Sequence, residues 1–455
     1  MGKYFGTDGV RGIANDELTP HLAYKIGRAG AFVLEEHSNH KNTRTRVIIG
    51  TDTRISKDLL SASIAAGVMS VGADVIDVGV IPTPGIAYLT RKLGADAGIV
   101  ISASHNPMEY NGIKFFGSEG LKLPDEIELE IEDYMDNMNL ITQSNIGEEV
   151  GKSQCGIDYV KSYEDSLVEC IREDLKGLNV TLDCAHGAAY KIGPEVFKRL
   201  GAHVHVINHT PNGININDEA GSTCTKGLSQ AVLQNKSDIG LAFDGDADRL
   251  IAIDEEGNQI DGDKIMLICA KYLKEEGKLA QNKLVVTVMS NLGLHMAAKE
   301  LGIEPEVTAV GDRYVLERML EKGYSLGGEQ SGHMIFLDYN TTGDGILSAL
   351  MLSKILKKSG KKISQLAEIM EVMPQVLINA KVKNATKENY QTDEEIQKRI
   401  KELEKKMEGK GRVLIRHSGT EPLVRVMLEG EDQEQINAYA RELADFIEEK
   451  LNATK

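Results

Sequence analysis

Short apolar runs and amphipathic helical stretches alternate along most of the chain. Runs rich in Val and Ile predict buried strands, and apolar residues at helical spacing between them predict helices. In the first third of the chain the predicted strands are 46–52, 74–80 and 97–101, and the predicted helices are 56–71, with Ser56 as N-cap, and 84–93. Strands separated by helices of this length are typical of βαβ units, so the pattern predicts an α/β fold.

The pattern restarts twice after a polar stretch at 139–154, which we interpret as a linker. The second region has predicted strands 179–187, 203–207, 238–243 and 250–254 and predicted helices 157–174 and 188–200. The third has predicted helices 262–275, 293–301, 314–322 and 343–357 and predicted strands 283–288 and 305–310. We therefore expect three α/β units of similar organisation.

The last part of the chain has a different pattern. Its predicted strands are 374–382, 413–416 and 423–430, and its predicted helices are 392–407, with Thr392 and Glu395 as a capping box, and 433–451. This segment is a smaller α+β domain. The predicted domains are 1–150, 151–256, 257–371 and 372–455.

Composition narrows the class of protein. A chain of 455 residues with 41% hydrophobic and 27% charged residues is typical of a globular protein with several cores. The net charge of −17 argues against nucleic-acid and anionic-membrane partners. No apolar run reaches membrane-spanning length, the N-terminus lacks a signal-peptide core, and the five cysteines are scattered. We expect a soluble cytoplasmic protein with reduced thiols.

A serine loop follows the apolar run 97–101. Small polar residues closed by Pro107 form a tight turn that presents the hydroxyl of Ser104 beyond the end of a strand, where open α/β sheets place their chemistry. His105 is adjacent and Lys114 supplies a positive charge. Alone, this pattern is also that of an ordinary Ser/Asn turn.

The motif DGDADR places Asp244, Asp246 and Asp248 at alternate positions after a predicted strand. Three neighbouring carboxylates repel one another, and a divalent cation is the usual compensation. A calcium loop ending at Glu255 is the competing interpretation, but its sixth position is Arg249 instead of glycine and its flanks are predicted strands. The spacing favours a Mg²⁺ site that serves phosphoryl transfer, with Arg249 as a neighbouring cation.

Three further loops carry candidate binding residues. GEQSGH contains Glu329, Ser331 and His333, which suit sugar hydroxyls or an amine. RHSGTEPLVR has the donors of a phosphate-binding loop: Arg416, Ser418, Gly419, Thr420 and Arg425. GTDGVRG adds Arg11 in a glycine-rich loop. Each loop taken alone is also compatible with a solvated turn.

Together these motifs resemble the α-D-phosphohexomutase superfamily over nearly the whole chain, and within it the phosphoglucosamine mutase subfamily. GTDGVRG, ISASHNP with NGIKFF, DGDADR, GEQSGH and RHSGTEPLVRV occur in the superfamily's order and spacing. Gln330 in GEQSGH favours this subfamily over phosphomannomutase/phosphoglucomutase, which remains the alternative; His417 departs from the Pro or Lys of many relatives. The resemblance implies three α/β/α domains with mixed sheets and a C-terminal α+β domain, similar to TATA-binding-protein folds, around one central cleft.

The resemblance also implies a mechanism. Ser104 would carry a phosphoryl group next to one Mg²⁺ per site, bound by Ser104, Asp244, Asp246 and Asp248. Glucosamine 6-phosphate and glucosamine 1-phosphate would interconvert through glucosamine 1,6-bisphosphate, supplying cell-wall precursor synthesis. Arg11, Arg249 and Lys114 would stabilise charge. Lys114 or His105 would exchange the proton, with Lys114 favoured because surrounding cations would lower its pKa. The GEQSGH and RHSGTEPLVR residues would bind sugar and phosphate. A homodimer is expected.

A phosphatase and a non-catalytic sugar-phosphate or Ca²⁺-binding protein are the alternatives from other classes. The first would release phosphate from the phosphoserine, whereas a mutase excludes water from it. The second would not depend on Ser104.

Overall fold

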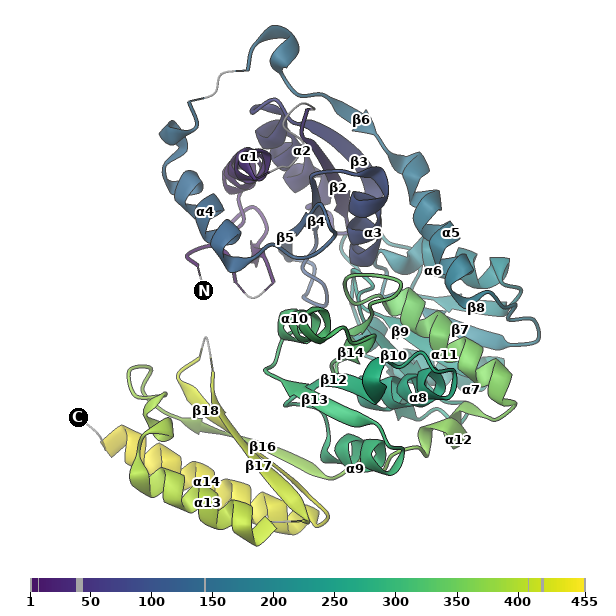
Figure 1. The fold of residues 1–455 in the computed structure, drawn as a ribbon, viewed down its shortest axis with the longest axis vertical. Helices are drawn as coiled ribbons and strands as arrows, with labels where there is room; N and C mark the ends of the chain where they lie inside the picture. The colour runs from purple at the N-terminus through teal and green to yellow at the C-terminus, as the bar shows by residue number, and fades with distance from the viewer. Residues whose placement is uncertain are drawn as a thin grey trace. The chain divides into compact units, whose positions relative to one another are not determined.

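The computed structural model describes residues 2–6, 8–37, 44–142, 145–407, 409–418 and 421–453. Its contacts divide the chain into two compact units, Met1–Met289 with Ile303–Ile369 and Ser290–Gly302 with Met370–Lys455. The first unit contains three mixed sheets with helices, and the second contains an antiparallel sheet with helices (Figure 1). The predicted α/β class with a terminal α+β part is therefore confirmed. No helix within the described ranges combines the length and apolarity needed to cross a bilayer.

The first sheet has the order β1-β5-β4-β2-β3-β6. Its strands are β1 (Val10–Ile13), β2 (Arg46–Thr51), β3 (Asp74–Val80), β4 (Ala97–Ile101), β5 (Tyr110–Gly117) and β6 (Ser153–Cys155). The accompanying helices are α1 (Pro20–Glu36), α2 (Lys57–Met69), α3 (Thr83–Leu93) and α4 (Asp125–Asp136), with short turns η1 (Met138–Leu140) and η2 (Gly147–Glu149). Apolar residues of the sheet and of α1, α2 and α4 form one buried core.

Two local expectations fail in this region. Strand β6 pairs with β3, so the end of the predicted linker 139–154 is part of the sheet. Ser56 does not cap α2 with its side chain; its hydroxyl instead accepts a hydrogen bond of 2.9 Å from the Asn111 amide. In both cases a partner distant in sequence determined the structure.

The second sheet has the order β11-β10-β9-β7-β8. Its strands are β7 (Asn179–Asp183), β8 (His203–Ile207), β9 (Ile239–Phe243), β10 (Leu250–Ile253) and β11 (Gln259–Ile260). The helices of this region are η3 (Ile157–Tyr159), α5 (Val160–Ile171), α6 (Ala189–Arg199), η4 (Gly221–Thr223) and α7 (Lys226–Asn235). Because β9 and β10 are antiparallel, with Phe243 opposite Leu250, the acidic motif DGDADR is the loop of a hairpin.

The third sheet has the order β13-β12-β14-β15. Its strands are β12 (Lys283–Thr287), β13 (Glu304–Thr308), β14 (Leu326–Gly328) and β15 (Met334–Phe336). The helices are α8 (Gly262–Glu275), η5 (Ala280–Asn282), α10 (Asp312–Lys322), α11 (Gly345–Ser359) and α12 (Ile363–Ala367). The GEQSGH loop joins β14 to the antiparallel β15.

The second unit has an antiparallel sheet of order β16-β18-β17. Its elements are α9 (Leu292–Glu300), β16 (Gln375–Lys381), η6 (Asn389–Gln391), α13 (Glu394–Met407), β17 (Gly411–His417), β18 (Leu423–Gly430) and α14 (Gln433–Ala453). The predicted cap of α13 is wrong: the Asp393 carboxylate, not Thr392, accepts the backbone N–H groups of Glu395 and Ile396 at 3.0 Å.

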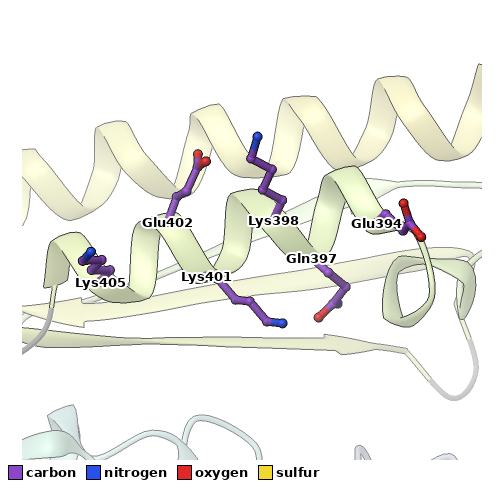
Figure 2. A pocket seen from close by; sticks show the side chains of 6 residues that line it. All are labelled: Glu394, Gln397, Lys398, Lys401, Glu402 and Lys405. Carbon is purple, nitrogen blue, oxygen red and sulfur yellow. The ribbon is translucent and has the colours of Figure 1, made fainter.

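A hollow along α13 is lined by the side chains of that helix alone, Glu394, Gln397, Lys398, Lys401, Glu402 and Lys405 (Figure 2). None of them belongs to a predicted site. The four-domain division at 150, 256 and 371 stays a prediction.

Candidate active site

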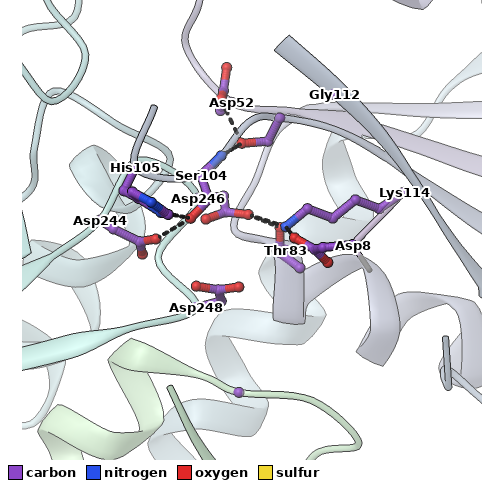
Figure 3. A network of polar contacts seen from close by, with 12 residues as sticks. Asp8, Asp52, Thr83, Ser104, His105, Gly112, Lys114, Asp244, Asp246 and Asp248 are labelled. Atoms are coloured by element: carbon purple, nitrogen blue, oxygen red, sulfur yellow. Dashed lines mark hydrogen bonds and ion pairs between the residues drawn. The ribbon is translucent and has the colours of Figure 1, made fainter. Parts of the chain in front are cut away.

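Ser104 lies in the loop between β4 and β5. Its hydroxyl donates a hydrogen bond of 2.6 Å to Asp244 and lies 3.3 Å from the Nδ1 atom of His105 (Figure 3). The Ser104 backbone has φ +51°, a left-handed conformation that is strained for a residue other than glycine and concentrates at functional sites. The structure thus brings the predicted serine onto the predicted metal loop.

The three aspartates of the β9–β10 hairpin form a buried cluster. One carboxylate oxygen from each of Asp244, Asp246 and Asp248 lies within 4.8 Å of the others. One oxygen of Asp246 and one of Asp248 are buried without a hydrogen-bond partner among the described residues. Burial, together with Asp248 and Asp246, raises the pKa of Asp244 well above its usual range. Unpartnered hard oxygens with mutual repulsion fit a divalent cation, and in particular Mg²⁺ or Ca²⁺.

The calcium-loop interpretation does not fit the fold. Strands flank the cluster on both sides, whereas a calcium loop of that type joins two helices. Glu255, the would-be last ligand, instead accepts a hydrogen bond of 2.6 Å from the Ser364 hydroxyl.

Lys114, on β5, bridges two carboxylates. Its ammonium lies 3.1 Å from Asp246 and 3.0 Å from Asp8 (Figure 3). Burial lowers the pKa of Lys114, but Asp246, Asp8 and Asp248 outweigh burial and raise it above the ordinary lysine value. The expectation that surrounding cations lower this pKa is therefore wrong, because the nearest neighbours are anions.

His105 behaves in the opposite way. Burial and the nearby Arg249 and Arg11 lower the pKa of its imidazole to about 4, so the ring is neutral at pH 7. Arg11 lies on strand β1, opposite Gly112, and not in a loop as expected. The Nε atoms of Arg11 and Arg249 are buried and have no hydrogen-bond partner among the described residues. Each guanidinium group therefore has an Nε–H that no hydrogen bond occupies, although the Arg249 Nε lies 3.8 Å from the Asp248 carboxylate.

The third-sheet loop reaches the same cluster through His333. Its two ring nitrogens lie 3.4 Å from Asp248 and 3.5 Å from Asp312. Burial lowers the pKa of His333, and the two aspartates overcome this effect and raise it to about 9. Glu329 accepts the Gly311 N–H at 3.1 Å, and Ser331 is exposed.

Gln330, the residue that suggested the subfamily, donates to Asp261 at 3.2 Å.

The RHSGTEPLVR residues belong to the second unit. Arg416 on β17 is directly opposite Arg425 on β18, and both are half-buried. Burial and Arg425 lower the pKa of Arg416. The Ser418 hydroxyl accepts the Glu421 N–H at 3.1 Å, whereas Gly419 and Thr420 lie outside the described residues. Like charges opposite one another destabilise a sheet, so an anion between them would be favourable.

Sequence reasoning missed several residues around the cluster. Asp8 contacts Lys114, Arg11 and Lys122, and it is part of the GTDGVRG motif that had drawn attention only to Arg11. Thr83, at the start of α3, donates its hydroxyl to Asp246 at 2.7 Å across 163 residues of sequence. No local signal indicated Thr83, because its partner is defined only by the fold.

Comparison with known proteins covers the whole chain. Four models of phosphoglucomutase/phosphomannomutase match in order: alpha/beta/alpha domains I, II and III at residues 2–141, 157–257 and 261–373, and the C-terminal domain at 377–446. The chain is 59% identical to the phosphoglucosamine mutase of Clostridioides difficile (strain 630) over 99% of this chain and 100% of that protein. It is 58% identical to the phosphoglucosamine mutase of Caldicellulosiruptor bescii over the same shares.

Solved structures agree on the fold. A phosphoglucomutase/phosphomannomutase family protein from Burkholderia thailandensis has a TM-score of 0.79 at 23% identity, with 98% of both chains covered. The N-acetylphosphoglucosamine mutase of Aspergillus fumigatus, solved with GlcNAc-6P and magnesium, has a TM-score of 0.70 at 18% identity, with 99% of this chain and 96% of that chain covered. With the family models and the full-length relatives, the comparison shows that this chain belongs to the phosphoglucomutase/phosphomannomutase family of phosphohexomutases.

Proposed function

We propose that the chain is an isomerase that interconverts glucosamine 6-phosphate and glucosamine 1-phosphate through a phosphoserine at Ser104. The observation that carries the proposal is the Ser104 hydroxyl, 2.6 Å from Asp244 in a cluster of three buried carboxylates. Full-length relatives named phosphoglucosamine mutase support the choice of sugar.

The reaction consists of two phosphoryl transfers. In the first, the P–O bond to Ser104 breaks, a P–O bond to the free sugar oxygen forms, and a base takes the hydroxyl proton of the sugar and passes it to the Ser104 oxygen that leaves. The resulting glucosamine 1,6-bisphosphate turns round and returns its other phosphoryl group to Ser104, so no phosphate is gained or lost.

The main requirement of this reaction is the stabilisation of negative charge, because the transferring phosphoryl oxygens are negatively charged throughout. One Mg²⁺, bound by Asp244, Asp246, Asp248 and the Ser104 phosphate, would neutralise part of it. The Nε–H groups of Arg11 and Arg249 have no hydrogen-bond acceptor among the described residues, and Lys114 is held protonated by its carboxylate neighbours, so all three side chains would stabilise the transferring oxygens.

The proton acceptor is either Lys114 or His105. Lys114 would first have to lose its proton, although Asp246 and Asp8 stabilise the protonated form. His105 is already neutral, and its Nδ1 atom lies 3.3 Å from the Ser104 hydroxyl. The variants Lys114→Gln and His105→Gln separate the two: the one that removes the base abolishes the pH dependence of kcat.

The remaining roles also belong to the proposal. Glu329, Ser331 and His333 would bind the sugar in both orientations, and Arg416, Ser418, Gly419, Thr420 and Arg425 would bind the phosphate that is not reacting. We further propose a cytoplasmic homodimer that supplies amino-sugar precursors of the cell wall.

A second candidate is phosphomannomutase/phosphoglucomutase activity, which the description of the matching family models names. Rates on glucosamine, glucose and mannose 6-phosphates separate the two candidates. A preference for glucose or mannose phosphate would overturn the choice of substrate but not the phosphoserine mechanism.

The decisive experiment labels the serine. Purified protein is incubated with Mg²⁺ and glucosamine 1,6-bisphosphate, and the phosphorylated residue is located by peptide mass spectrometry. We expect phosphate on Ser104, and we expect Ser104→Ala to lose both the label and the turnover of glucosamine 6-phosphate by at least about 10⁴-fold. Full activity in Ser104→Ala would contradict the proposal, and steady release of inorganic phosphate would favour a phosphatase.

A further inference from the structure

Among the described residues, Arg54 is the largest residue whose side chain is fully buried. It lies three positions after the end of β2. A buried guanidinium is costly unless a counter-charge and acceptors for its five N–H groups surround it. The counter-charge is Asp52, whose carboxylate accepts the Arg54 Nε–H at 2.8 Å and the Arg54 backbone N–H at 2.9 Å.

The other four N–H groups of Arg54 all bind the serine loop. One terminal nitrogen donates to the carbonyls of Ser104 at 3.0 Å and Asn106 at 2.8 Å. The other donates to the carbonyls of Tyr110, at 3.0 Å, and Pro107. The whole connection from β4 to β5 is therefore wrapped around one planar group, and no donor of Arg54 is left over for a ligand.

Asp52 holds the start of the same loop through a second path. The Ser102 hydroxyl donates to Asp52 at 2.6 Å and accepts the backbone N–H of Ser104 at 3.0 Å. Figure 3 shows Asp52 on the opposite side of the Ser104 backbone from the three aspartates. Ser104 is thus fixed at its N–H by Ser102, and its carbonyl accepts from Arg54 and, at 2.9 Å, from the Asn217 amide.

This arrangement matters for a loop that must carry a phosphoryl group. The left-handed conformation of Ser104 persists only if its surroundings over-determine it. Because the peptide unit is planar and trans, the N–H of His105 points away from Arg54, and it has no protein acceptor within the described part of the chain.

We infer that Arg54, with Asp52 and Ser102, is the positioning device of the phosphoserine loop: it holds the Ser104 hydroxyl in transfer geometry without itself touching the phosphoryl group. The inference rests on the proposed function. Arg54 is a positioning residue because its charge is matched by Asp52 and its donors are all occupied by backbone carbonyls.

The test compares two changes in the full-length protein with Mg²⁺. Ser102→Ala removes one hydroxyl and keeps every charge; Arg54→Lys keeps the charge but offers three donors that cannot copy the planar fork. We expect kcat for glucosamine 6-phosphate to fall about tenfold in Ser102→Ala and about 100-fold in Arg54→Lys, with KM within about threefold. We also expect both variants to lose a larger share of preformed phosphoserine to water than the wild type does. The reason is that a loosened loop no longer holds the phosphoryl group in position for transfer to the sugar.

Ser237→Ala is the matched control. Its buried hydroxyl bonds Thr181 at 2.7 Å in the second sheet, so the change deletes a bond of the same kind outside the loop and should leave kcat and the partition unchanged. The inference is wrong if Ser102→Ala keeps the wild-type kcat and the wild-type partition of phosphoserine between water and sugar, and loses only thermal stability as Ser237→Ala does. The comparison of Ser102→Ala with Ser237→Ala decides the question even if Arg54→Lys does not fold. If the wild type itself forms no phosphoserine, the proposed function fails, and the inference with it.

Discussion

The carboxylate cluster of the first unit and the arginine pair of the second handle charge in opposite ways. Asp244, Asp246 and Asp248 are all buried, and Lys114 beside them is only 3% exposed. Arg416 and Arg425 face one another on adjacent strands, and both are half-buried. Arg425 pairs with the carboxylate of exposed Glu421 at 3.2 Å.

The difference follows from what each region has to do in the proposed reaction. A phosphoryl transfer needs reacting atoms held in a water-poor site where electrostatic interactions are strong. Binding an unreactive phosphate needs accessible donors, and bidentate arginines supply them without deep burial. We therefore expect changes in the first region to act on kcat and changes in the second to act on KM.

Of the changes that compare the two regions, the largest effect should come from the carboxylate cluster. Asp246→Asn removes a charge from the proposed metal site, so we expect kcat to fall about 10³-fold and the Mg²⁺ concentration for half activity to rise about 10–100-fold. Activity measured across a Mg²⁺ titration checks this. Asp254→Asn, a buried carboxylate in the next turn of the same region that accepts backbone N–H groups, is the control and should leave the Mg²⁺ dependence unchanged.

Asp344, a buried carboxyl outside the cluster, tests whether burial alone is enough to make a carboxyl of the first unit affect kcat. Burial raises the pKa of Asp344 to about 6, although Leu347, Tyr163 and Asn340 donate to it. A folded-state pKa above the unfolded value favours the protonated form, so its contribution to stability is full below about pH 4 and is lost as pH rises through 6.

Asp344→Asn imitates the protonated carboxyl. Relative to this variant, we expect the wild-type free energy of unfolding to fall by about 2 kcal/mol between pH 4 and pH 7.5, with kcat little changed. Denaturant unfolding of both proteins at the two pH values checks this. A difference that does not vary with pH would mean that Asp344 stays ionised throughout.

In the second unit, Arg425→Ala should raise KM for the sugar phosphate about 30-fold and leave kcat within about threefold, because one of two phosphate donors is lost. Stability should not fall, since the change also relieves repulsion with Arg416. Steady-state kinetics and a thermal melt measure both effects. A fall in kcat as large as that of Asp246→Asn would break the distinction between the two regions.

The smallest expected effect concerns Thr83, which supports the proposed metal ligand Asp246. Thr83→Val deletes the hydroxyl that donates to Asp246, and we expect kcat to fall about tenfold at limiting Mg²⁺. Thr90→Val is the matched control: Thr90 is buried on the same helix, but its hydroxyl bonds the Ile86 carbonyl. Equal losses in the two variants would mean that Thr83 acts only through the stability of α3.

Local sequence determined much of this protein. The alternation of apolar runs and helices predicted strands such as 74–80 and 203–207 with their observed bounds, because closely spaced Val and Ile residues favour a strand even where it is only partly buried. The spacing of Asp244, Asp246 and Asp248 was enough to predict a cluster, since three carboxylates within one short hairpin loop cannot be far apart.

Tertiary structure alone decided the partners of those motifs. The pKa of Lys114 is raised because Asp8 and Asp246 lie beside it, and the sequence places them 106 and 132 residues away. The loop carbonyls that Arg54 binds and the Asp246 carboxylate that Thr83 binds become their neighbours only when β2, β4 and the β9–β10 hairpin are brought together, so no local motif indicated these contacts. Hydrogen bonds and charge interactions act over a few ångströms of space, whatever the distance along the chain.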